Sequence, residues 1–351
     1  MIVYFADRML NVIATASTNL PGGLQIQDDK LTRRIEGDAD SFDCTISAGD
    51  TPLTEIEKTI FPCNNILVED KREILLFSIL DTDFASDTRE ITIYAESGGL
   101  DLLNDMVTNL SGSGATIQSY VNRTIDGTGW EIGINEIPTL TRTLSYDSED
   151  TVISRLQKIA GEFDAELSYS VEMDRMTVTR RLVNIHERRG KEVGASLRTG
   201  REIEKITVKR SAAELATAIL PICPDASLPS YDDGDMYVRG GILYSREALS
   251  TWARATGNHI VLAYQSEAKT AQSLLDAAKK MLNKSRVLQT TYEVELAYLP
   301  EGIEIGDTIS LVDEADGIFL QARVMVLETS ETNGTRRVTL GDISEETDET
   351  I

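Results

Sequence analysis

The clearest pattern in the chain is a strict alternation of apolar and polar residues near its C-terminus. A period of two places every second side chain on the same face of a β-sheet. Asp316-Gly317 and Asn333-Gly334 interrupt the pattern, and both dipeptides are typical of hairpin turns that require positive φ. The sequence therefore predicts that the chain ends in an antiparallel meander. Its apolar positions are Ile309, Leu311, Ile318, Leu320, Ala322, Val324, Val326, Val338 and Leu340.

Residues 1–100 show the same alternation in shorter segments, for example at Phe42, Cys44 and Ile46. Many short strands at this spacing are typical of a small β-barrel or sandwich. We therefore predict an N-terminal β-barrel over residues 1–100. Its expected strands are Ile2–Phe5, Leu10–Ala14, Phe42–Ile46, Ile66–Val68, Leu75–Ile79 and Ile91–Tyr94, with polar turns at Glu69–Arg72 and Asp81–Arg89.

After Gly98 and Gly99 the apolar spacing becomes helical. The clearest helix follows Ser148, which is a suitable N-cap residue. Because a hairpin follows the helices, we predict an α+β insertion over residues 101–195. Its expected elements are helices over Leu102–Leu110, Ile117–Val121 and Val152–Ala160, a stop at Ser111–Gly114, and a hairpin of Leu167–Val171 with Met176–Thr179.

The rest of the chain is predicted to form a second β-barrel from residues 196–230 and 286–345. A loop and helix insertion at residues 231–285 interrupts it, and the helix is expected to begin at Ser266. The prediction for the whole chain is an α+β, mainly β fold with two small antiparallel β-barrels. The helix is expected to pack its apolar stripe against the terminal β-barrel or its neighbour. The stripe comprises Ala271, Leu274, Leu275, Ala278, Met281 and Leu282.

The charge of the chain narrows its possible partners. Among 351 residues, 58 are acidic and 34 are basic, which gives a net charge of −24. A surface this acidic repels phosphate backbones, so we expect no sequence-specific nucleic-acid binding. The acidic surface either keeps the protein soluble or forms a wall that DNA passes without binding. No apolar run reaches the ~18 residues of a membrane span, and the N-terminus has no signal-peptide pattern.

Cysteine and histidine give no sign of catalysis or of metal binding. Cys44, Cys63 and Cys223 are odd in number and far apart, which argues for buried free thiols rather than disulfides or a metal site. The histidines are His186 and His259. Neither stands in a nucleophile motif or in HExxH. We predict a solvated loop around His186, no catalytic residues, no cofactor and no metal.

Two charged segments remain as candidates for binding. The loop around Asp232, Asp233 and Asp235 could offer oxygen ligands to a cation, but its spacing fails the EF-hand pattern. Asp313, Glu314 and Asp316 are expected to be turn residues. The basic tract Arg180–Lys191 lacks aromatic residues for base stacking, so a solvated loop or a contact with an acidic partner is expected.

Three stretches of the chain resemble one known family. They are Ile66–Val107, Ser145–Ser170 and the segment EIGDTISL at residues 304–311. Their order and spacing resemble those of siphophage and prophage tail hub proteins of Gram-positive hosts. The family is also described as tail-associated lysins or prophage endopeptidase tail proteins.

The resemblance implies a fold like that of contractile-tail hubs and a homotrimeric, structural role at the virion tail tip. Such a trimer would adapt a sixfold tail tube to a threefold tip, plug it, and open for the tape-measure protein and DNA. The distal tail protein and tail-tip or receptor-binding proteins would be its partners, after synthesis in the host cytoplasm. Catalysis in this family belongs to C-terminal extensions, and since the chain stops at Ile351 we expect none and no enzyme activity.

Two other functions remain open at this point. One is a peptidoglycan- or carbohydrate-binding or hydrolysing tail protein, which exposed aromatic platforms would favour; the chain has only Trp130 and Trp252. The other is the hub of a contractile injection device, which would share the fold.

Overall fold

The computed structural model describes residues 1–19, 24–36, 39–70, 73–252, 254–266, 268–296, 300, 302–315 and 318–345. The chain forms two compact units, a larger one of Met1–Ile206 with Glu293–Ile351 and a smaller one of Thr207–Tyr292. The sequence placed the insertion at residues 231–285 and assigned residues 196–230 to a barrel. The smaller unit is longer because β17 (Ala218–Ile222) pairs with β19 and β20 of the same unit.

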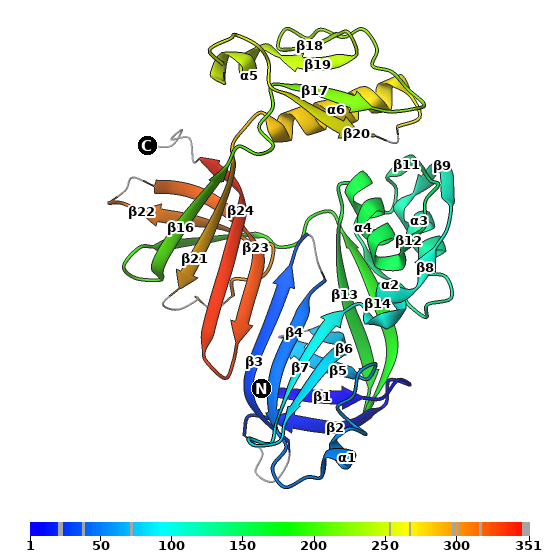
Figure 1. Ribbon diagram of the computed structural model, residues 1–351, viewed down its shortest axis with the longest axis vertical. Helices are drawn as coiled ribbons and strands as arrows, with labels where there is room; N and C mark the ends of the chain where they lie inside the picture. The colour runs from blue at the N-terminus through cyan, green and yellow to red at the C-terminus, as the bar shows by residue number, and fades with distance from the viewer. Residues whose placement is uncertain are drawn as a thin grey trace. The chain divides into compact units, whose positions relative to one another are not determined.

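The N-terminal region of the larger unit contains the six predicted strands, and also β3 and the short helix α1, which the sequence analysis did not predict (Figure 1). Alternate side chains such as Phe5, Phe42, Phe77 and Ile93 are fully buried between the strands. The strands pair antiparallel except where β2 meets β3 in parallel. The elements are β1 (Ile2–Ala6), β2 (Val12–Ser17), β3 (Leu24–Arg34), β4 (Ser41–Ser47), α1 (Leu53–Ile56), β5 (Asn65–Asp70), β6 (Glu73–Ala85) and β7 (Glu90–Ser97).

Of the two turns predicted in this region, the structure confirms one and corrects the other. β6 continues through the predicted turn Asp81–Arg89 as far as Ala85, because its backbone pairs with β7 from Asp81 to Ala85. Polar side chains are compatible with this pairing since that end of the strand is partly exposed. The hairpin between β5 and β6 is present, with Asp70 opposite Glu73, while residues 71–72 lie outside the described residues.

The α+β region that follows has its own apolar core. Leu102, Tyr120, Leu156 and Phe163 are buried there, and the rings of Tyr120 and Phe163 are 6.0 Å apart. The elements are α2 (Gly99–Asn104), β8 (Met106–Val107), β9 (Leu110–Thr116), α3 (Ile117–Thr124), β10 (Glu131–Asn135), β11 (Thr141–Tyr146), β12 (Asp150–Thr151), α4 (Val152–Glu162), β13 (Glu166–Asp174) and β14 (Thr177–His186).

Three details of the α+β prediction were wrong. The first helix ends at Asn104, and the predicted stop Ser111–Gly114 lies in β9, which pairs with β11. Ser148 does not cap α4, because Thr151 accepts the hydrogen bond from the Ser154 backbone N–H. The β13–β14 hairpin turns after Asp174, so its strands are longer than predicted.

The C-terminal meander is confirmed. β22 (Thr308–Asp313), β23 (Ile318–Ser330) and β24 (Thr335–Glu345) pair antiparallel in sequence order. The alternation does not run unbroken, however. A register shift between Val324 and Val326 turns the strand, so that Leu327 is buried and Val326 is partly exposed. Asp316-Gly317 lies outside the described residues. β15 (Glu192–Arg198), β16 (Ile203–Ser211) and β21 (Gln289–Leu296) complete the region.

The two β-rich regions of the larger unit share one sheet. β23 pairs antiparallel with β3, with Val326 opposite Arg34 and Thr329 opposite Leu31. The strands of both regions thus belong to one 16-stranded sheet, whose path runs through this pair. The prediction of a mainly β fold is therefore correct. The prediction of two separate, closed barrels is not confirmed, because the strands of both regions belong to one sheet. No helix among the described residues is long and apolar enough to cross a membrane.

The smaller unit is a four-stranded sheet with a helix on it, in the order β18-β19-β17-β20. Leu275, Ala278 and Leu282 of α6 pack with Ile219 and Leu243 of the sheet. The predicted apolar stripe is therefore correct, and it packs on this sheet, whose strand β17 lies within residues 196–230 of the predicted second barrel. Instead of starting at Ser266, α6 is capped by Thr270 in a capping box with Ser273. The elements are β17, β18 (Met236–Arg239), β19 (Ile242–Ser245), α5 (Arg246–Thr251), β20 (Val261–Gln265) and α6 (Ala271–Ser285).

Candidate functional site

A groove of about 1140 Å³ is the main candidate for a binding site in the larger unit. Its walls come from β3, the β5–β6 hairpin, the end of β14, the loop before β22 and the β23–β24 hairpin. Segments that are distant in sequence therefore meet here. Charged residues of both signs line the groove, among them Arg33, Asp70, Glu73, Arg188 and Arg189.

Arg33 is the centre of one buried ion cluster in this groove. Its guanidinium lies 2.7 Å from Asp70, 3.3 Å from Glu73 and 3.4 Å from Asp40. Burial alone would lower the pKa of Arg33, but the three carboxylates raise it above its ordinary value. The cluster joins β3 to the β5–β6 hairpin.

Glu166 and Arg323 form a second buried ion pair. The Arg323 Nη1 and Nη2 atoms lie 2.6 and 2.7 Å from the two Glu166 oxygens, a bidentate geometry. Arg323 also donates to the carbonyls of Gly306 and Arg189. Burial alone would raise the pKa of Glu166, but hydrogen bonds from Arg323 and from the Arg189 N–H lower it. This pair connects β13 to β23.

Two glycines let two loops approach each other beside that ion pair. Gly190 has φ +83° and Gly306 has φ +87°, a backbone region that favours glycine. A Cβ on Gly190 would overlap the carbonyl group of Gly306. Asp307 fixes the same contact, since it accepts hydrogen bonds from the N–H groups of Lys191 and Glu304 at 2.9 and 2.8 Å.

The tip of the β23–β24 hairpin is held by β3. Asp29 is buried and accepts hydrogen bonds from the N–H groups of Glu331 and Thr332 and from the Thr332 hydroxyl. The N-terminal amine of Met1 lies 3.1 Å from Glu331. One buried carboxylate thus ties the C-terminal hairpin to the N-terminal region.

The prediction of a solvated loop around His186 was wrong. His186 is the last residue of β14, and its Nε2 and Nδ1 atoms lie 3.0 Å from Ser168 Oγ and 3.3 Å from Glu136 Oε1. The order serine, histidine, glutamate is that of a nucleophile with its base and orienting acid. However, Ser168 lies in mid-strand and is 7% exposed.

The neighbouring pair on the same two strands shows what this contact is. The Asn184 side chain donates to Ser170 Oγ at 2.9 Å with the same diagonal cross-strand spacing. Diagonal polar pairs of this kind are ordinary in antiparallel ladders. The arrangement around His186 is therefore explained by strand pairing.

The basic tract Arg180–Lys191 is not a loop throughout. Arg180 and Arg181 lie in β14, where Arg180 pairs with Glu131 and Glu172. Arg189 is buried and lines the groove. The tract therefore divides into a strand whose arginines have partners and a turn that contributes to the groove.

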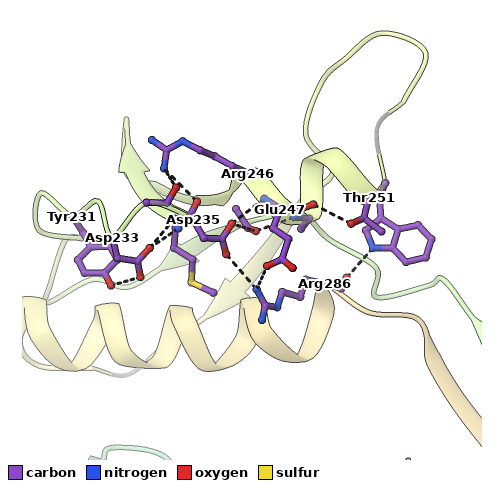
Figure 2. A network of polar contacts seen from close by, with 12 residues as sticks. Tyr231, Asp233, Asp235, Arg246, Glu247, Thr251 and Arg286 are labelled. Atoms are coloured by element: carbon purple, nitrogen blue, oxygen red, sulfur yellow. Dashed lines mark hydrogen bonds and ion pairs between the residues drawn. The ribbon is translucent and has the colours of Figure 1, made fainter. Parts of the chain in front are cut away.

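In the smaller unit, the acidic loop is held by protein donors (Figure 2). Arg246 contacts both oxygens of Asp232, and this hydrogen bonding lowers the pKa of Asp232 to about 2. Asp233 accepts from the Tyr231 hydroxyl at 2.5 Å and the Met236 N–H at 2.7 Å. Within the described residues, no group of three side chains is placed to hold a metal ion.

Asp235 links the same loop to two helices of the smaller unit. It accepts from the Ser245 hydroxyl and the Glu247 N–H, both at 2.9 Å, and lies 3.3 Å from Arg286 at the end of α6 (Figure 2). The Trp252 indole donates to the Arg286 carbonyl at 2.8 Å. The loop therefore connects the start of α5 to the end of α6.

The remaining flagged residues have structural explanations. Cys44 is buried as expected, but Cys63 is exposed and Cys223 is intermediate; all are free. His259 contacts Thr217 at 2.9 Å. Asp313 accepts from the Thr199 hydroxyl and the Ala315 N–H, and Glu314 pairs with Arg198. Asp316 lies outside the described residues.

Sequence reasoning singled out the basic tract that contains Arg188 and Arg189, but it missed the rest of the groove and the ion pairs of Arg33 and Arg323. Arg33, Glu166 and Arg323 stand in strands where a charged residue is expected to face solvent. Only Gly190, in an otherwise basic turn, offered a local signal, since a glycine there can mark close backbone approach.

Comparisons with known proteins agree with this fold. The family described as "Prophage endopeptidase tail" matches residues 191–351. No match was found among curated proteins. The 43 kDa tail protein of prophage MuSo2 from Shewanella oneidensis is 14% identical, with a TM-score of 0.65 and 98% of each chain covered.

Two further tail proteins are similar. One from Neisseria meningitidis MC58 is 15% identical, with a TM-score of 0.62, 90% of this chain and 92% of that chain covered. A prophage tail protein of Listeria monocytogenes EGD-e is 10% identical, with a TM-score of 0.60, 99% of this chain and 95% of that chain covered. The chain therefore has the fold of phage and prophage tail proteins.

Proposed function

We propose that the chain is a structural hub subunit at the tail tip of a phage or prophage. The observation that carries this proposal is the end-to-end likeness to the MuSo2 tail protein, which covers 98% of both chains. A likeness confined to one module would be compatible with a borrowed domain, whereas this one includes both units. The match of residues 191–351 to a tail family supports the same function independently of the fold.

In this proposal the subunit forms a homotrimer that adapts a sixfold tube to a threefold tip. The distal tail protein, the tape-measure protein and tail-tip or receptor-binding proteins are its partners, and a Gram-positive bacterium is its host. A trimer with closed threefold symmetry places the same face of each subunit around one axis, and the proposed channel follows that axis. Light scattering on the purified protein at micromolar concentration should give three times the monomer mass. A strict monomer, together with no labelling of tail tips by immunogold in intact virions, would contradict the proposal.

The net charge of −24 suits a channel for DNA. Each Lys or Arg contact with a phosphate adds salt-dependent attraction, so a wall rich in carboxylates lets DNA pass. We expect the inner surface of the trimer to carry more Asp and Glu than Lys and Arg. Arg180, which already pairs with Glu131 and Glu172, should face away from the opening. DNA binding by the isolated protein at physiological salt would contradict this mechanism.

We also propose that the chain is not an enzyme, and Ser168 allows a sharp test. If the contact with His186 is only a cross-strand pair, purified protein should not cleave peptidoglycan, and Ser168→Ala should change nothing. Asn184→Ala, which removes the neighbouring polar pair, is a matched control for the fold. Reproducible cleavage that Ser168→Ala abolishes and Asn184→Ala retains would show a hydrolase.

A further inference from the structure

Arg189 differs from Arg33, the other buried arginine that lines the groove. It is 8% exposed, and its Nη1 atom donates only to the backbone carbonyls of Arg34 and Leu167, at 3.0 and 3.3 Å. Among the residues that the structure describes, no carboxylate oxygen lies within ion-pair distance of it. Its Nε and Nη2 donors make no hydrogen bond to those residues.

The nearby carboxylates are already used by other groups. Asp40 and Glu73 pair with Arg33, and Glu166 is held on both oxygens by Arg323. Burial and the nearby Arg33 charge lower the pKa of Arg189, while Asp40, Glu73 and Glu166 act to raise it. Arg189 therefore has no counter-ion of its own among the described residues. A buried guanidinium in that state is costly, so a carboxylate from outside would relieve that cost.

We propose that the groove at Arg189 receives a single carboxylate carried on a peptide segment of a partner protein. The volume of about 1140 Å³ exceeds the ~300–1,000 Å³ typical of small-molecule pockets, so it suits a peptide better than a lone ion. Arg188, Lys191 and Arg336 add positive charge to its walls. Guanidinium groups bind carboxylates through paired hydrogen bonds, which gives the site its chemistry.

The other lining residues restrict the ligand further. Glu69, Glu136, Glu304 and Glu331 also line the groove, so its mixed charge favours a ligand with a single carboxylate over a polyanion such as DNA. Five apolar residues line the groove as well, but all are buried, so the carboxylate contact carries the recognition. They are Leu31, Val68, Ile303, Ile305 and Leu327.

Binding of two capped pentapeptides to the full chain tests the proposal. Both alternate alanine and valine around a central residue, which is glutamate in one and glutamine in the other; acetate and inorganic phosphate are further probes. We expect the glutamate peptide to bind at least tenfold more tightly than the glutamine peptide and either ion. Arg189→Met should remove that preference, and Arg180→Met, an exposed arginine on β14, should retain it.

A measurement on the unmodified protein covers the case in which Arg189→Met fails to fold. In an NMR titration, the glutamate peptide should shift the side-chain Nε–H resonance of Arg189. The resonance of Arg323 should not shift, because its guanidinium already binds Glu166. Equal binding of both peptides, an unshifted Arg189 signal, or tighter binding of phosphate would overturn the proposal. None of these outcomes depends on whether the chain is a tail hub, since trimer mass is measured separately.

Discussion

Replacing Glu166 by glutamine should destabilise the larger unit more than any comparable surface change. The substitution keeps the shape of the side chain but removes its charge, so the buried Arg323 would retain only the exposed Asp342 carboxylate, 3.6 Å away, as a counter-ion. The Arg323 side chain is 4% exposed and that of Glu166 is 14% exposed, so water screens the pair poorly. Removing one partner of a buried ion pair costs about 3–5 kcal/mol.

The sign of the pH dependence follows from the same contacts. Folding lowers the pKa of Glu166 below its ordinary value of about 4.3. A group of this kind contributes stability above its unfolded pKa, and the contribution is lost as pH falls through the folded pKa. The stability difference between wild type and Glu166→Gln should therefore be constant near neutral pH and shrink on acidification below about pH 4.3.

Urea unfolding measures this effect, because each compact unit contains one tryptophan. In a Trp252→Phe background, the buried Trp130 reports on the larger unit alone. Glu131→Gln, which breaks an exposed contact with Arg180, is the control and should leave the midpoint unchanged. A loss below about 1 kcal/mol for Glu166→Gln, or one that grows on acidification, would refute the reasoning about the buried pair.

Three further predictions concern stability. Gly190→Ala should weaken the larger unit strongly because a Cβ would overlap Gly306, while Gly194→Ala, at positive φ in open space, should cost less; urea midpoints compare them. Asp29→Ala should cost about 3 kcal/mol and open the β23–β24 tip to limited proteolysis; an unchanged digestion pattern would contradict the clamp. Leu275→Ala should cost about 2–5 kcal/mol in the smaller unit, read by Trp252 fluorescence; a loss within error would show the α6 stripe to be unimportant.

Much of the fold follows from local patterns in the sequence. The strands around Phe42 and Leu311, and the helix beginning at Val152, were found because each buries a face against its own neighbours. The errors fall where pairing with another strand outweighs side-chain pattern. Ser111–Gly114 reads as a helix stop, yet β11 pairs with this segment and makes it a strand. Val326 was assigned to the buried face because a bulge leaves no trace in an alternating sequence.

The candidate site was not predictable in the same way. Arg323 lies in an alternating strand, so the pattern assigns its charge to the solvent face, and at Arg33 the pattern predicted no strand. Both side chains are buried where strands from distant parts of the chain meet, as β23 and β3 do. Which strands meet is set by long-range pairing, and no window of neighbouring residues records it. The acidic loop around Asp232 shows the reverse case, a visible cluster whose carboxylates serve the loop itself.

The position of the buried charges indicates what they do for the fold. Each module has a mainly apolar core, although the α+β region contains the buried ion pair of Arg155 and Asp150. The ion pairs of Arg33 and Arg323 lie where β3, β13 and β23 come together. An apolar junction there would bind whichever exposed apolar surface met it first, whereas a charged junction is stable only when each guanidinium meets its own carboxylate. Arg189 is the one of these groups whose own carboxylate the described residues do not supply. Arg33 and Arg323 therefore have their carboxylate partners within the chain. The proposed partner protein would supply the carboxylate for Arg189.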